Sequence, residues 1–170
     1  MFELSKLDAG RVQPQQEVFC LAELLQDVVQ NYQLAAQERG VTLDLAASSH
    51  LQAKVQADIA MIERVLQNLI DNALRYTAAG GEVTLGIERR GAFMEISVSD
   101  TGRGIATADL PHIFERYWRA SDADDGAAGT SAGLGLAIVK RILDLHGSIV
   151  SVHSEFARGT RFDFLLPQAT

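Results

Sequence analysis

Apolar residues recur at helical spacing in three segments of the chain. Leu21 to Arg39 reads as one amphipathic helix, which Gly40 ends. Asp58 can cap a second helix over residues 58–76, and a third helix is predicted for 134–146. In the second helix the apolar side chains gather on one face: Ile59, Ile62, Val65, Leu66, Leu69, Ile70 and Ala73. Each helix is therefore expected to bury one side.

Alternation of apolar and polar residues predicts the strands. The predicted strands are residues 41–45, 82–90, 92–100, 148–154 and 160–166, with short extended segments at 17–20 and 52–56. Gly91 separates two of them and favours an antiparallel pair. Because long helices precede strands and hairpins are present, the sheet should be mixed. The pattern predicts an α+β fold, not a doubly wound parallel one.

Two segments lack this regularity. Apolar residues near the start indicate a helix that ends near Asp8–Gly10, followed by a linker to residue 16, although an ordinary frayed terminus is an alternative. Residues 121–132, SDADDGAAGTSA, are small and acidic, so we expect a loop without regular structure.

Composition narrows the classes of function. Fifteen Lys and Arg against 22 Asp and Glu give a net charge of −7, which argues against a nucleic-acid partner. No stretch approaches the ~20 apolar residues of a membrane helix, and no export signal is expected. The single cysteine, Cys20, excludes an internal disulfide and favours a reducing compartment, and the four scattered histidines have no metal-ligand spacing.

The polar face of helix 58–76 carries two asparagines four residues apart, Asn68 and Asn72, together with Arg64, Asp71 and Arg75. A polar face is commonly just solvated. Asparagine is a poor helix former, however, and a merely wet face favours Glu, Lys or Gln. Amide oxygens beside an arginine suit Mg²⁺ together with ligand phosphates.

Two glycine-rich segments are the other candidates for ligand binding. Residues 100–105, DTGRGI, close a strand, and Asp100 can accept from an exocyclic amine where glycine lets a ligand approach; a plain turn is the alternative. Residues 129–137 open a helix whose first N–H groups form an anion site. Their sequence, GTSAGLGLA, fits neither a P-loop nor a dinucleotide fingerprint, and its G-x-S-x-G lacks the preceding strand of a hydrolase elbow.

Phe114, Tyr117 and Trp118 form a small aromatic cluster near two arginines. Packing in the core and docking of a partner are both consistent with such a cluster.

The order of these motifs resembles the N, G1, F and G2 boxes of sensor histidine kinases. The matching segments are NLIDNALRYT at 68–77, DTGRGI at 100–105, IFERYWR at 113–119 and GLGL at 133–136. His146-Gly147 and Gly159-Thr160 resemble that family's closing hairpin, so the resemblance covers residues 18–167. It implies a two-layer α/β sandwich with helices on one face of a mixed sheet, as in the gyrase, chaperone and mismatch-repair ATPases. Residues 1–16 would end a dimerisation helix and its linker, and 17–170 would form the ATP-binding domain.

The resemblance also assigns roles. Asn72 would coordinate Mg²⁺, and Asn68 would stand where relatives place a catalytic glutamate. Arg75, in place of a more usual lysine, would touch phosphate beside Tyr76, and Asp100 would accept from the adenine amine. Arg119 would approach the γ-phosphate, and residues 120–132 would form a lid in which Thr130 or Ser131 could replace the Thr or Ser missing at Ala132. The remaining nucleotide-binding residues would be Gly102, Gly104, Ile105, Gly133, Leu134, Gly135, Leu136 and Thr160.

The function implied is transfer of the ATP γ-phosphoryl group, with Mg²⁺, to a histidine on a separate dimerisation domain absent from this chain. None of the four histidines stands in a phosphoacceptor motif. Expected partners are that domain and a response regulator; the fragment would be monomeric, without membrane contact, and the whole kinase a homodimer whose catalytic part is cytoplasmic. A related serine kinase or ATPase, or a degenerate docking module, are the alternatives.

Overall fold

A mixed five-stranded sheet organises the part of the chain that the computed structural model describes, residues 7, 12–46, 52–116, 118 and 135–169. Its strand order is β2-β4-β5-β7-β6. β2 pairs with β4 in parallel, and the other neighbouring pairs are antiparallel. The strands are β2 (Thr42–Leu45), β4 (Glu82–Arg90), β5 (Phe93–Asp100), β6 (Ser151–Glu155) and β7 (Gly159–Pro167).

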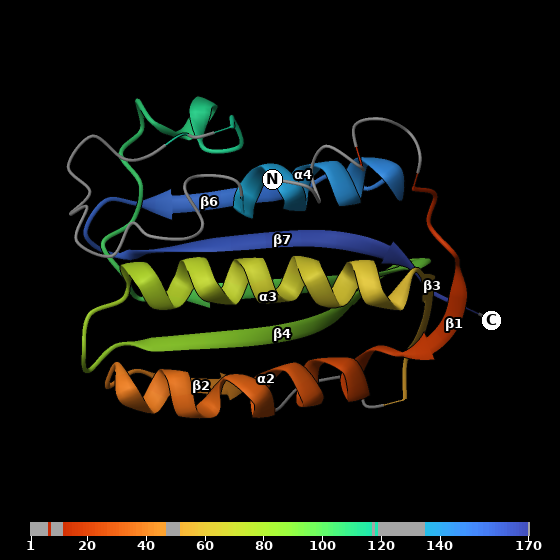
Figure 1. Ribbon diagram of the computed structural model, residues 1–170, viewed down its shortest axis with the longest axis horizontal. Coiled ribbons are helices and arrows are strands. Elements are labelled where there is room, and N and C mark those ends of the chain that lie inside the picture. Colours follow the sequence, from red (N-terminus) through yellow and green to blue (C-terminus); the bar gives the residue numbers. More distant parts are fainter. Residues whose placement is uncertain (1–6, 8–11, 47–51, 117, 119–134, 170) are drawn as a thin grey trace.

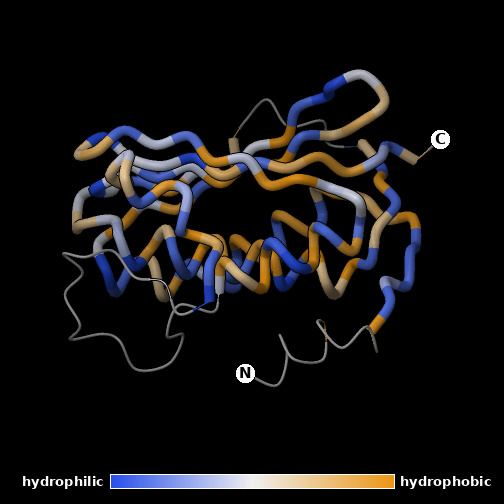
Figure 2. The backbone as a smooth tube through the Cα atoms, turned by 90° about the horizontal axis from the view of Figure 1, so that it is seen from above, coloured by the Kyte–Doolittle hydropathy of each residue, from blue (hydrophilic) through white to orange (hydrophobic). Residues whose placement is uncertain are grey.

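Three helices cover one face of this sheet, as Figure 1 shows. They are α2 (Leu21–Glu38), α3 (Ile59–Tyr76) and α4 (Gly135–Leu145). A short antiparallel pair, β1 (Glu17–Cys20) and β3 (Lys54–Ala57), adjoins the sandwich. The view in Figure 2 separates the sheet from the helical layer. The predicted α+β class and its two-layer arrangement are confirmed.

The core lies between the two layers. Alternate residues of the strands face the helices, because side chains of a strand point in turn to opposite sides of the sheet. The apolar face predicted for α3 is confirmed except at Ile59, which stays partly exposed, and Leu74 is buried in addition. The buried strand residues include Val83, Leu85, Ile87, Met94, Ile96, Val98, Phe162, Phe164 and Leu166.

Both ends of α3 are fixed by side chains. The Asp58 carboxylate accepts from the N–H of Met61 at 3.1 Å, and the Thr77 hydroxyl donates to the Ala73 carbonyl at 2.7 Å. His146, just past α4, accepts from the backbone N–H of Asp58 at 3.1 Å through Nε2. This histidine therefore ties the end of α4 to the start of α3, in agreement with a structural role.

One prediction of local structure is wrong, and one short element was not predicted. The strand predicted from residue 148 begins only at Ser151, because Gly147 adopts a φ of 68° and the Ser148 hydroxyl, not its backbone, bonds the Leu165 carbonyl at 2.7 Å. A 3₁₀ turn at Leu110–His112 was not expected. After that turn, Phe114 packs against the core: its ring and that of Phe162 lie in a T-shaped arrangement with 6.2 Å between the ring centroids.

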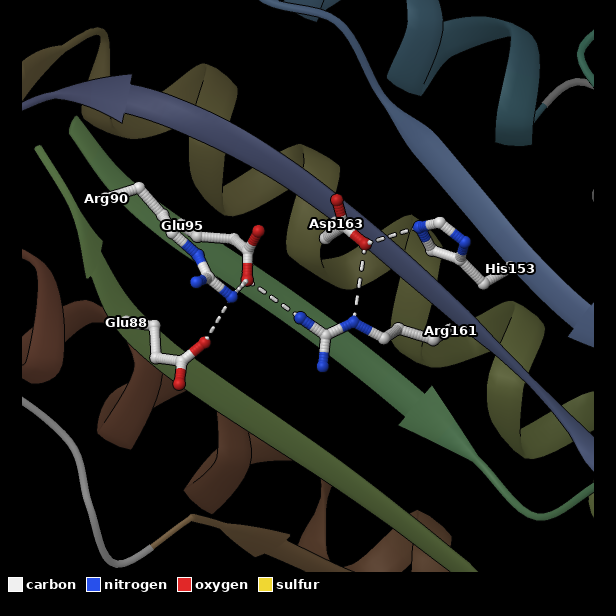
Figure 3. A network of polar contacts seen from close by, with 6 residues as sticks. All are labelled: Glu88, Arg90, Glu95, His153, Arg161 and Asp163. Atoms are coloured by element: carbon white, nitrogen blue, oxygen red, sulfur yellow. Dashed lines mark hydrogen bonds and ion pairs between the residues drawn. The ribbon is translucent and has the colours of Figure 1, made fainter.

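The open face of the sheet carries a network of charges, shown in Figure 3. The Glu95 carboxylate lies 2.8 Å from the Arg161 guanidinium and 3.4 Å from that of Arg90. Arg161 also contacts Asp163 at 3.3 Å. Since both acids are mostly shielded from solvent, these contacts link β4, β5 and β7 across the face opposite the helices.

Candidate functional site

A pocket of about 280 Å³ opens between α3, the end of β5 and the β6–β7 hairpin. Seven of the residues proposed from sequence line it together, although they come from four distant parts of the chain. They are Asn72, Tyr76, Asp100, Gly104, Ile105, Leu136 and Thr160. Five further lining residues were not assigned to the site from sequence: Arg103, Ala106, Asp109, Trp118 and Phe156.

Asp100, the last residue of β5, is one of the polar residues that line the pocket. Its Oδ1 accepts from the N–H of Gly102 at 2.8 Å, and Thr160 is its partner across β7. Burial raises the pKa of this carboxyl above its ordinary value, while the hydrogen bonds from Gly102 and Thr160 oppose the rise. A partly buried carboxylate that is held in one orientation favours a ligand with an N–H donor over a ligand that presents an acceptor.

The loop after Asp100 is held against two other segments. A Cβ at Gly102 would overlap the Tyr76 carbonyl oxygen, and one at Gly104 would overlap the Glu155 carbonyl oxygen. Gly104 also has a φ of +72°, which disfavours any side chain. Gly102 is buried and does not line the pocket; it sets the approach of the loop to α3.

Another part of the pocket wall comes from α3 and the start of α4. Asn72 and Leu136 reach the pocket. One turn before Asn72, Asn68 lies beneath Gly135, where an added Cβ would be 4.0 Å from the asparagine side chain. The Nδ2 of Asn68 is buried and has no hydrogen-bond partner in the described part of the chain. A buried amide donor without a partner is costly, and an anionic ligand at this point would satisfy it.

Two other polar residues of α3 point in different directions, one toward the pocket and one toward α2. Tyr76 faces the pocket, where the Arg103 guanidinium stacks over its ring at 4.6 Å. Asp71 instead hydrogen-bonds Tyr32 of α2, and partial burial raises the pKa of both groups. The polar stripe is thus partly a contact between α2 and α3 and not wholly a ligand-binding face.

The residues expected around the phosphates fall in two groups. Asn68, Arg75 and Gly135 are described and do not line the pocket itself, although Asn68 and Gly135 lie next to each other. The residues predicted to bind phosphate at Arg119, Thr130, Ser131, Gly133 and Leu134, and the lid predicted over 120–132, lie outside the described residues. Of the aromatic cluster, Trp118 lines the pocket and Tyr117 lies outside the described residues.

The donor set fits a magnesium ion that is shared with a ligand. No group of three or more His, Cys, Asp and Glu in the described residues could hold a metal by itself. Mg²⁺ bound with a nucleotide commonly needs only one or two protein oxygens, because the phosphates and water supply the rest. The Asn72 amide oxygen at the pocket is such a donor.

We did not assign Phe156, Arg103, Ala106 and Asp109 to the site from the sequence. For Arg103 and Phe156 the reasons differ. Arg103 stands inside DTGRGI, between the two glycines, and could have been found there. Nothing in the local sequence marks Phe156, because its place in the pocket follows from the packing of one hairpin on a loop some 50 residues earlier.

A second pocket of about 350 Å³ lies between α2 and the start of α3. It is acidic, with Glu23, Asp27 and Glu63 in its wall, and includes none of the residues proposed from sequence. Within the residues described, no helix is both long and apolar enough to cross a membrane.

This chain is similar to proteins of one known family. Residues 57–170 match the family described as histidine kinase-, DNA gyrase B- and HSP90-like ATPases. The sensor histidine kinase CusS of Escherichia coli is 34% identical over 98% of this chain and 34% of its own length. The sensor-like histidine kinase SenX3 of Mycobacterium tuberculosis is also 34% identical, over 98% of this chain and 40% of its own length.

Two solved structures have the same fold. Full-length ShkA in complex with AMPPNP superposes with a TM-score of 0.86 at 32% identity, over 99% of this chain and 34% of ShkA. The nucleotide-free catalytic domain of the histidine kinase ThkA gives a TM-score of 0.78 at 25% identity, over 91% of this chain and 96% of that domain. This chain thus spans about a third of the length of CusS and of full-length ShkA.

Proposed function

Because this chain belongs to the family of histidine kinase-, DNA gyrase B- and HSP90-like ATPases, we propose that it is the catalytic domain of a sensor histidine kinase. It would bind ATP with Mg²⁺ and deliver the γ-phosphoryl group to a histidine of a dimerisation domain. The observation that carries this proposal is the convergence of Asn72, Asp100, Thr160 and Leu136 on one pocket.

The pocket orients the nucleotide along its length. Asp100 accepts from the exocyclic amine of adenine, and Ile105 and Leu136 supply apolar contact. The amide of Asn68, buried without a partner beneath the start of α4, donates to a phosphate oxygen. Asn72 would hold the magnesium ion, and Arg75 on the same helix would add positive charge to the phosphate site.

The rest of the phosphate site is proposed on the resemblance alone. Arg119 would neutralise charge that develops on the γ-phosphate, and Thr130, Ser131, Gly133 and Leu134 would close over the nucleotide from the lid. Magnesium supplies charge neutralisation for phosphoryl transfer when it is bound. Catalysis then rests mainly on positioning and on charge, as in other phosphoryl transferases.

Asparagine at position 68 favours a kinase over a hydrolase. A carboxylate at this point would act as a general base for water and promote hydrolysis of ATP. An amide donates a hydrogen bond and takes up no proton at neutral pH. With an amide at position 68, the γ-phosphoryl group would therefore stay on ATP until an acceptor imidazole arrives.

Residues 1–16 are proposed to be the end of a dimerisation helix and its linker. Leu7 is buried, and its carbonyl accepts from the Arg141 guanidinium of α4 at 3.2 Å. In the whole protein the domain would act in a homodimer, in the cytoplasm, and pass phosphate onward to a response regulator.

The proposal is tested by phosphate transfer between separate proteins. None of the four histidines of this chain stands in a phosphoacceptor motif, so radiolabelled ATP alone should leave the chain unlabelled. Addition of the dimerisation domain from the same kinase should yield an acid-labile label on that domain, at a rate that rises with its concentration. Asn72→Ala and Arg119→Ala should abolish the label. An acid-stable phosphate label on this chain itself, which persists in the Asn72→Ala variant, would contradict the proposal.

A further inference from the structure

Phe156 is a large aromatic residue that the fold does not bury. It stands in the turn between β6 and β7, its exposed fraction is 62%, and it lines the nucleotide pocket. An exposed phenylalanine ring keeps apolar surface in water, which is unfavourable unless a ligand covers it. The other two phenylalanines of this hairpin, Phe162 and Phe164, are buried in the core.

The hairpin tip is fixed against the loop that follows Asp100. The N–H of Ala157 donates to the Arg103 carbonyl, and the N–H of Ile105 donates to the Ser154 hydroxyl at 2.7 Å. The Ser154 hydroxyl also lies 2.9 Å from that of Thr160. The first two contacts join the turn and β6 to the loop, and the third joins β6 to β7, so the turn and the pocket wall form one unit.

Close backbone packing restricts the same turn. At Gly159 an added Cβ would overlap the Asp100 carbonyl oxygen, just as one at Gly104 would overlap that of Glu155. Ala157, next to the aromatic residue, has a φ of 69°, the one positive value outside glycine in the described residues. The main chain on both sides of Phe156 is therefore held in place, and its ring is presented at the pocket by a rigid support.

Phe156 belongs to the hairpin that lies beside Asp100. This hairpin packs on residues 103–105, and its Thr160 pairs directly with Asp100. Asn72, the residue proposed to hold magnesium beside the phosphates, comes from α3 instead. The place of Phe156 in the fold therefore favours a contact with the base of the nucleotide.

We propose that Phe156 is a further nucleotide-binding residue, whose ring packs against the purine base that Asp100 recognises. This inference rests on the proposed function, since it deepens the assignment of the same pocket. The ring and Ile105 would enclose the base, so that affinity for the nucleoside part is set by the hairpin as well as by the loop. Aromatic stacking of this kind adds to simple burial of apolar area.

The test compares Phe156→Ala with Phe93→Ala, the same change at an exposed phenylalanine outside the pocket. Phe93 is 44% exposed and begins β5, seven residues and about 23 Å along the strand from Asp100. Calorimetry should show that Phe156→Ala weakens ADP about tenfold, and Phe156→Leu by less, because leucine retains bulk without a ring face. Phe93→Ala should bind ADP as the wild type does.

Two further measurements assign the contact. Adenosine, titrated by NMR, should lose affinity by the same factor as ADP, because it contains the base and no phosphate. The thermal midpoint of Phe156→Ala without nucleotide should match that of the wild type, since the ring is largely exposed. Equal ADP affinity in Phe156→Ala and Phe93→Ala, or loss for ADP without loss for adenosine, would overturn the assignment. Failure of the wild-type chain to bind ADP at all would instead overturn the proposed function.

Discussion

Gly104 lies so close to the carbonyl oxygen of Glu155 that its hydrogen atom cannot be replaced by a methyl group without displacing the hairpin. We predict that Gly104→Ala lowers the free energy of unfolding by about 2–4 kcal/mol, since it combines a steric overlap with a positive φ. Nucleotide affinity should fall as well, because the displaced segments form the pocket wall.

Gly91 offers a matched control for that change. Its φ is +62°, but an added Cβ would meet nothing within 4 Å. Gly91→Ala should therefore show only the backbone cost of about 1 kcal/mol, measured by urea denaturation of both variants. Equal losses in the two variants would mean that the contact between the loop and the hairpin is not restrictive.

Asn72→Ala should remove the magnesium dependence of ATP binding. The amide oxygen of Asn72 is the proposed protein ligand, and loss of a hydrogen bond or ligand contact to a charged group costs about 1.5–3 kcal/mol. We expect roughly a tenfold to hundredfold weaker affinity with Mg²⁺ present, and little change without it. Gln67→Ala, on the same helix but outside the pocket wall, should behave as the wild type in calorimetry with and without Mg²⁺.

Nucleotide binding should release protons from Asp100 at a pH near the raised pKa of this carboxyl. Burial raises the pKa of this carboxyl, and an adenine amine that donates to it favours the ionised form. ADP affinity should therefore fall as the pH drops through the raised pKa. Calorimetry in buffers of different ionisation enthalpy measures the protons released, and Asp100→Asn should release none from this site and bind ADP more weakly.

The raised pKa of Asp100 makes the stability of the nucleotide-free protein depend on pH in the opposite direction to nucleotide affinity. A folded pKa above the unfolded value means that Asp100 contributes stability below the unfolded pKa and loses it as pH rises through the folded one. The wild type should thus gain stability relative to Asp100→Asn on acidification. A difference in unfolding free energy that does not vary with pH would contradict the burial of this carboxyl.

Glu95→Gln should destabilise the sheet by about 1 kcal/mol, and less at high salt. Its carboxylate is 16% exposed and contacts guanidinium groups from two neighbouring strands, Arg90 and Arg161. Glu88 contacts Arg90 alone among the charged residues that the structure describes and is 57% exposed, so Glu88→Gln should change stability little. Thermal denaturation of both variants at low and high ionic strength measures the contrast.

Much of the fold was predictable because local pattern and tertiary environment agree. The apolar stripe of residues 59–76 could only face a core, and Asp58 caps that helix as expected. β4 and β5 alternate over most of their length, and Gly91 lies in the turn between them, so their pairing follows from periodicity and one turn. Where a side chain replaced the backbone pairing, as Ser148 does before β6, the periodicity predicted that the strand begins three residues earlier than it does.

The residues of the candidate site also include some that the sequence predicts and some that only the tertiary structure places there. Asn72, Asp100 and Leu136 belong to motifs whose residue types and order are specific, and these could be predicted from the amino-acid sequence alone. Phe156 could not, because its role depends on the approach of Gly104 and Gly159 to backbone atoms far away in the chain. Local composition determined which groups can bind a nucleotide; only tertiary packing decided which aromatic ring is left uncovered beside it, since burial is a property of the whole fold.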